Sequence, residues 1–176
     1  LGLTVLLLLT VARNDLLALW QAKMPADAPN RFVINLQPEQ RPGFLDAFRQ
    51  QGLSVPTPSP MVRARLVAVA GKAIAAADYA DERTRRLVER EFNLSWTDQL
   101  PAGNRIVAGQ WHGRGGPQFS VEQELARTLG LNLGDPLTFE VDGLRVTGPI
   151  TSLRKLEWDS MRVNFFVIAP PGVIEN

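Results

Sequence analysis

Residues 151–172, TSLRKLEWDSMRVNFFVIAPPG, form the densest run of large and charged side chains in the sequence. Their second half, residues 163–168, is rich in β-branched and aromatic residues, and Pro170 and Pro171 bring it to an end. Such a run is typical of a strand that is buried on both faces. We therefore expect the chain to be organised around a central strand in this segment.

The first half of the same stretch carries most of the candidate site residues. They can form a ligand or catalytic site, or they can form ion pairs that hold a loop on the domain, with Trp158 as a buried packing anchor. Alternatively, Trp96, Trp111 and Trp158 can line an apolar surface that touches a lipid or another subunit. The candidate interface or lobe-junction residues are Trp96, Trp111, Arg154, Glu157, Trp158, Asp159 and Arg162.

The composition limits the chemistry that this chain can carry out. Its 176 residues, 45% of them hydrophobic, can bury a sizeable core in one domain or in two small lobes. A formal net charge of +1 gives no support for a nucleic-acid surface. The chain has no cysteine and a single histidine, His112, so thiolate and multi-histidine metal sites are excluded. We expect no cofactor, metal or catalytic residue.

The chain begins with an apolar run, LGLTVLLLLTVA, which is followed by Arg13, Asn14 and Asp15 before leucines resume at helical spacing. This run alone is too short to cross a hydrocarbon core, which needs about 20 residues of helix. A buried core helix and a signal-peptide segment are alternatives. We favour the C-terminal part of a transmembrane helix with its stalk at residues 1–20, followed by a connector at residues 21–30.

The next segments predict a small α+β layer in which a helix covers one face of a sheet. Residues 31–36 are expected to form a strand, and residues 62–70 a second strand. Between them, residues 42–51 are expected to form a short helix that Gly52 ends. The charged residues 81–92 are typical of a solvated helix.

Residues 120–131 carry the best local signal for a helix. Ser120 as N-cap and Gln123 three residues later make a capping box, and Gly130 can end the helix in the left-handed conformation. Residues 137–148 then predict a β-hairpin, because apolar residues alternate on one side of an Asp-Gly turn signal.

Hydrolysis is the main catalytic alternative. His112 is the one candidate base, and it stands in a glycine-rich loop at residues 111–117, while no Gly-x-Ser-x-Gly elbow occurs. The loop also lacks the strand-to-helix placement of a nucleotide cradle. We therefore expect a polar surface loop here.

Three pieces of the sequence resemble one family. They are LLALWQAKMPADAPNRFVINLQPEQ at residues 16–40, RRLVEREFNLSW at residues 85–96, and SVEQELARTLGLNLGDPLTFEV at residues 120–141 followed by TSLRKLEWDSMRVNFFVIAPPGV at residues 151–173. On these pieces the chain resembles the extracytoplasmic domain of FtsX/MacB-type ABC transporter permeases, most closely the YbbP-like permeases.

The resemblance implies an α+β fold of the MacB-like periplasmic type. A membrane-proximal α+β lobe would comprise residues 31–92 and 148–176. A smaller β-rich lobe with one short helix would be inserted at residues 93–147. The domain would lie on the periplasmic side of a bacterial cytoplasmic (inner) membrane.

The resemblance also implies a non-catalytic role. A separate cytoplasmic ABC ATPase subunit would hydrolyse ATP, and this domain would couple its movement to the handling of a hydrophobic or lipid-like substrate outside the membrane. Further implied partners are a periplasmic esterase or thioesterase and a second permease copy, with no nucleic acid. A soluble lipid or ester hydrolase and a generic extracytoplasmic binding or scaffold module are the alternatives.

Overall fold

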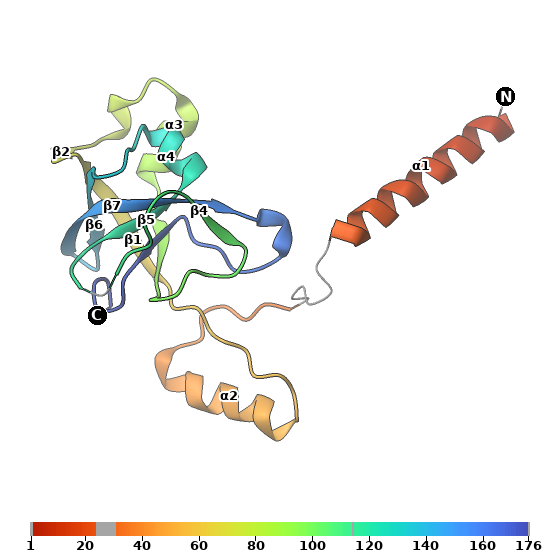
Figure 1. The fold of residues 1–176 in the computed structure, drawn as a ribbon, viewed down its shortest axis with the longest axis horizontal. Helices are drawn as coiled ribbons and strands as arrows, with labels where there is room; N and C mark the ends of the chain where they lie inside the picture. The colour runs from red at the N-terminus through yellow and green to blue at the C-terminus, as the bar shows by residue number, and fades with distance from the viewer. Residues whose placement is uncertain (1, 24–30, 114, 176) are drawn as a thin grey trace. The chain divides into compact units, whose positions relative to one another are not determined.

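The computed structural model describes residues 2–23, 31–113 and 115–175 (Figure 1). Most of the predicted connector lies outside these residues. The described chain forms two compact units. One, the N-terminal unit, comprises Leu1–Pro56 with Glu157–Arg162, and the other, the sheet unit, comprises Thr57–Leu156 with Val163–Asn176.

The N-terminal unit contains α1 (Gly2–Lys23), η1 (Pro38–Gln40), α2 (Arg41–Gln50) and η3 (Trp158–Ser160). The window Gly2–Leu19 of α1 has a mean hydropathy of 1.6, and α1 is long and apolar enough to cross a membrane. The helix α2 confirms the predicted helix at residues 42–51. The rings of Phe44 and Phe48, one turn apart on it, lie 5.0 Å from each other between centroids.

The prediction of a strand at residues 31–36 is wrong. Within the described part of the chain these residues pair with no strand, and Phe32, Val33 and Ile34 are exposed. Local β-propensity is not sufficient for a strand, because its backbone groups need a partner strand to bond with.

The sheet unit contains the remaining elements, which are β1 (Val62–Val69), β2 (Lys72–Ala73), η2 (Ala76–Asp78), α3 (Glu82–Glu89), β3 (Phe92–Trp96), β4 (Asn104–Gly109), β5 (Phe119–Glu122), α4 (Gln123–Leu129), β6 (Pro136–Val141), β7 (Leu144–Leu156) and β8 (Val167–Ala169). Helices and one sheet confirm the predicted α+β class.

Six strands of the sheet close into a ring. Following the pairing from β1 leads through β3, β8, β5, β7 and β6 and back to β1, while β2 and β4 extend from β1 and β7 (Figure 1). The β3–β8 and β5–β7 pairs are parallel and the others are antiparallel. Closure leaves these six strands without a free edge along the ring, which favours a stiff body.

The core combines side chains from the strands of this ring with residues of α3 and α4. On β6, Leu137, Phe139 and Val141 alternate with less buried residues, as the period of two predicts. The ring of Phe139 meets those of Phe119 and Phe92 edge-on, at centroid distances of 5.1 and 6.4 Å. The predicted hairpin is confirmed, since β6 pairs with the first half of β7 across the Asp-Gly turn.

The predicted start of the fourth helix is wrong. Residues 119–122 form β5, in which Ser120 is fully buried between β7 and β8. The helix begins at Gln123, and the carboxylate of Glu122 caps it by accepting the N–H groups of Glu124 and Leu125. A carboxylate suits this role because it can accept both bonds at once. Gly130 ends the helix at φ 67°, as expected.

The strands of the sheet come from both predicted lobes. β1, from residues 31–92, pairs with β6, from residues 93–147, and β5 pairs with β8, from residues 148–176. Residues 93–147 therefore do not form a sheet of their own. The central strand predicted at residues 163–168 is observed as β8, which is shorter and begins four residues further along the chain, at Val167. As predicted, β8 is buried on both faces.

Candidate functional site

Arg154 lies in the second half of β7, which pairs with β4 on one side and β5 on the other. Its side chain is fully buried, at 0% exposure. Burial lowers the pKa of Arg154 to about 10, an effect that the nearby Glu122 carboxylate partly offsets. The guanidinium therefore stays charged at neutral pH in the interior of the sheet unit.

The guanidinium of Arg154 makes five hydrogen bonds within the sheet unit. Its Nε donates to Ser120 Oγ at 2.9 Å, and its Nη2 donates to Phe165 O at 3.0 Å and to Phe166 O and Ser120 O at 3.3 Å. Its Nη1 donates to the side-chain oxygen of Asn104. The side chain thus joins β5, β4 and the segment that leads into β8.

Two further bonds extend this buried network. Ser152 Oγ donates to Ser120 Oγ at 2.6 Å, and Asn104 Nδ2 donates to Asn164 Oδ1 at 2.9 Å. The acceptors of Arg154 are hydroxyl, amide and carbonyl oxygens, and among the described residues Arg154 makes no salt bridge. Arg154 is thus a buried residue whose bonds hold β5, β4 and the segment before β8 together.

The other charged candidates belong to the N-terminal unit. Glu157, Trp158, Asp159 and Arg162 fall in the segment Glu157–Arg162, where the 3-10 turn η3 is fixed by a bond from Ser160 Oγ to Glu157 O at 2.6 Å. Trp158 is 52% exposed, so the prediction that its indole is a buried packing anchor is wrong.

The tryptophans of the sheet unit have packing roles. Trp96 ends β3 and packs against the core. Trp111 donates its indole N–H to Asp98 O at 3.1 Å and stacks on His112 with a centroid distance of 4.0 Å. His112 Nε2 lies 2.7 Å from Thr97 O. These contacts fix the segment around residues 111–112 on the chain that follows β3.

The prediction that His112 lies in a polar surface loop is wrong. Its side chain is buried, at 4% exposure. Desolvation lowers the pKa of His112, and Nδ1 has no hydrogen-bond partner among the described residues. With Nε2 bound to a backbone carbonyl and the ring enclosed, His112 has no access to a substrate. The geometry gives no support to the hydrolase alternative.

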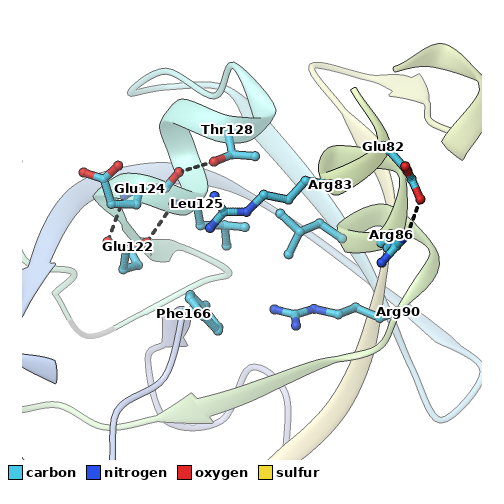
Figure 2. Close-up of a pocket in the computed structure, with 10 residues that line it drawn as sticks. Glu82, Arg83, Arg86, Arg90, Glu122, Glu124, Leu125, Thr128 and Phe166 are labelled. Carbon is cyan, nitrogen blue, oxygen red and sulfur yellow. Dashed lines mark hydrogen bonds and ion pairs between the residues drawn. The ribbon is translucent and has the colours of Figure 1, made fainter. Parts of the chain in front are cut away.

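Sequence reasoning missed a cleft between α3 and α4, which the structure shows with a volume of about 640 Å³ (Figure 2). Arg83, Arg86 and Arg90 line one wall, and Glu124 and Thr128 line the other. The apolar side chains of the lining belong to Leu87, Leu125 and Phe166. The spacing of the three arginines places them along α3 and its end, a signal visible in the sequence but interpreted there as a solvated helix face.

Some charged side chains of the cleft form salt bridges and others do not. Arg86 pairs with Glu82, and Glu124 pairs with Arg127 outside the lining. The guanidinium of Arg90 lies 5.5 Å from the ring centroid of Phe92 and 5.6 Å from that of Phe166. Among the described residues, no carboxylate makes a salt bridge with Arg83 or Arg90. The cleft thus combines apolar side chains with two cations that make no salt bridge among the described residues.

Comparison with known proteins points to the permeases of ABC transporters as the class that this chain resembles. Over 176 residues, 99% of this chain, it is 40% identical to one such protein. That relative is the uncharacterized ABC transporter permease YbbP of Escherichia coli strain K12, and the chain spans 21% of its length. No family model and no solved structure matches the chain. The predicted resemblance to YbbP-like permeases is confirmed over this segment.

Proposed function

We propose that the chain is a non-catalytic, extracytoplasmic part of an ABC transporter permease in a bacterial cytoplasmic membrane. The observation that carries this proposal is the 40% identity to YbbP over 99% of the chain. The helix α1 supports it, because 22 helical residues extend for about 33 Å and a hydrocarbon core is about 30 Å thick. In this arrangement α1 lies in the membrane and anchors the chain.

Within such a transporter, ATP is hydrolysed by a separate cytoplasmic subunit, and this domain transmits the resulting movement to a hydrophobic or lipid-like substrate. A closed ring of strands suits transmission because it moves as a body instead of deforming. Arg154 adds to this stiffness by bonding to both Asn104 of β4 and the backbone at residues 165–166. A MacB-like arrangement, a second permease copy and an esterase or thioesterase partner belong to the same proposal.

Cysteine accessibility in living cells tests the placement, because the chain has no cysteine of its own. Gln99→Cys puts a thiol at an exposed position, and Ser152→Cys puts one at a fully buried position as a control. In the full-length protein, a membrane-impermeant maleimide should label Gln99→Cys in intact cells and leave Ser152→Cys unlabelled. Labelling of Gln99→Cys only after permeabilisation would place the domain in the cytoplasm and contradict the proposal.

Coupling is tested with the same protein and its ATPase subunit reconstituted in nanodiscs. We expect the two proteins to co-purify, and deletion of residues 57–156 to abolish any substrate-dependent change in ATP hydrolysis while leaving the complex intact. An ATPase whose response is unchanged by the deletion would exclude a coupling role for the sheet unit.

A further inference from the structure

We propose that the cleft between α3 and α4 binds an acidic peptide segment of a partner protein, with Arg83 and Arg90 taking carboxylates and the apolar lining taking a hydrophobic side chain between them. This inference stands on the geometry of the sheet unit alone and does not depend on the permease role. It assigns a binding surface to residues that the predicted sites did not include.

The charge balance of the cleft selects an anionic ligand. Its carboxylates are already occupied, since Glu82 pairs with Arg86, Glu124 pairs with Arg127, and Glu122 caps α4. The guanidiniums of Arg83 and Arg90 make no salt bridge among the described residues, and Asp81, whose pKa is lowered mainly by hydrogen bonds from Thr84 and also by the charge of Arg83, caps the start of α3 instead of lining the cleft. A guanidinium offers a planar fork that matches a carboxylate, so both positions favour acidic side chains.

Contacts with two aromatic rings preorganise the side chain of Arg90 for binding. Its guanidinium lies over the rings of Phe92 and Phe166, and Phe166 is itself part of the lining. Stacking limits the rotation of this side chain before a ligand arrives, which reduces the entropy lost on binding. In Figure 2, Arg83 extends from α3 toward α4, while Arg90 extends toward Phe166, so the two cations reach different parts of the cleft.

The spacing of the two cations favours a peptide over a ligand with one head group. Arg90 lies seven positions after Arg83, directly after the end of α3, and seven helical positions correspond to about 10 Å along a helix axis. Three residues of an extended peptide cover about the same distance. A segment with acidic residues at positions i and i+3 can therefore reach both guanidiniums, and the residues between them can contact Leu87 and Leu125. A single carboxylate or phosphate would use only one guanidinium.

The experiment measures fluorescence anisotropy of a fluorescein-labelled peptide, Gly-Asp-Phe-Leu-Asp-Gly, titrated with the complete protein in non-ionic detergent. We expect saturable binding that weakens at least tenfold in the double variant Arg83→Gln, Arg90→Gln. The matched control is Arg63→Gln, Arg145→Gln, which removes two exposed charges from strands of the sheet. This control should change the dissociation constant less than twofold.

Because Arg90 also contacts core rings, the single variant Arg83→Gln provides a second test in which those contacts are kept, and it should weaken binding at least threefold. Thermal unfolding by circular dichroism checks that each variant is folded. Equal weakening in the cleft and control variants would show nonspecific charge attraction and overturn the proposal. It would also be overturned if a peptide with Asn in place of Asp bound equally well, or if decanoate bound the cleft while the peptide did not.

Discussion

Replacing Arg154 with methionine tests whether the hydrogen bonds of a buried cation outweigh the cost of burying it. The two effects oppose each other, because methionine removes the charge together with every bond that the guanidinium makes. The structure allows their sizes to be compared. Phe166 O keeps a bond from the N–H of Glu122, and Ser120 Oγ keeps the bond from Ser152.

Two acceptors depend on Arg154 alone among the described residues, namely Phe165 O and Asn104 Oδ1. Leaving each of them buried without a donor costs about 1–3 kcal/mol. The space left by the shorter side chain adds about 1 kcal/mol. Against this, the lowering of the Arg154 pKa to about 10 corresponds to roughly 3 kcal/mol of lost solvation that the substitution relieves. The balance is a loss of about 2 kcal/mol in the free energy of unfolding.

We expect Arg154→Met to lower the midpoint of thermal unfolding by about 6 °C, measured by near-UV circular dichroism on the complete protein in non-ionic detergent. Arg154→Lys should lose at least as much, because it keeps the cost of burying a charge and loses the planar set of donors. The control is Arg145→Met on the same strand, whose exposed pair with Glu140 at 3.8 Å contributes less than about 1 kcal/mol. A methionine variant as stable as the unsubstituted protein would refute the reasoning and show that charge burial dominates.

Two further predictions concern the loop that precedes β5. A Cβ added at Gly148 would lie 2.5 Å from Pro117 O and 3.0 Å from Gln118 N, which are both backbone atoms. Gly148→Ala should therefore lower the free energy of unfolding by about 1–3 kcal/mol, measured by urea unfolding. The control Gly43→Ala should leave it unchanged, because a Cβ at Gly43 meets open space. Burial lowers the pKa of His112 below the 6.5 of an unfolded chain, so its contribution to stability is complete above about pH 6.5 and is lost as the pH falls through the folded-state pKa. His112→Gln should therefore give a flatter dependence of the unfolding midpoint on pH between about 7 and 5, and an unchanged slope would show that His112 does not titrate in this way.

Elements determined by local pattern were predictable from the sequence. The hairpin of β6 and β7 follows from alternation around an Asp-Gly turn, and the end of α4 follows from Gly130. In both cases the information lies within a few residues of the element itself. The class of fold, α+β, and the resemblance to YbbP-like permeases were also within reach.

Elements that depend on distant partners were not predictable. Ser120 has the chemistry of an N-cap, but β7 and β8 take it into the sheet, and Glu122 replaces it at the start of the helix. Residues 31–36 have strand propensity and no paired strand among the described residues. The α3/α4 cleft combines residues from three separate parts of the chain, so charge pattern alone could not distinguish its arginines from a solvated helix face.

The hydrogen bonds of Arg154 explain why a charged residue is buried in β7. Residues 163–166 approach the sheet without joining a strand, and the carbonyl of Phe165 accepts a bond from the Arg154 guanidinium, because buried carbonyls require donors. A guanidinium has five N–H groups in one plane and can meet several acceptors from a single position, which no neutral side chain can do. Arg154 therefore replaces part of a missing strand neighbour. The cations proposed here for ligand recognition, Arg83 and Arg90, lie instead along the cleft between α3 and α4.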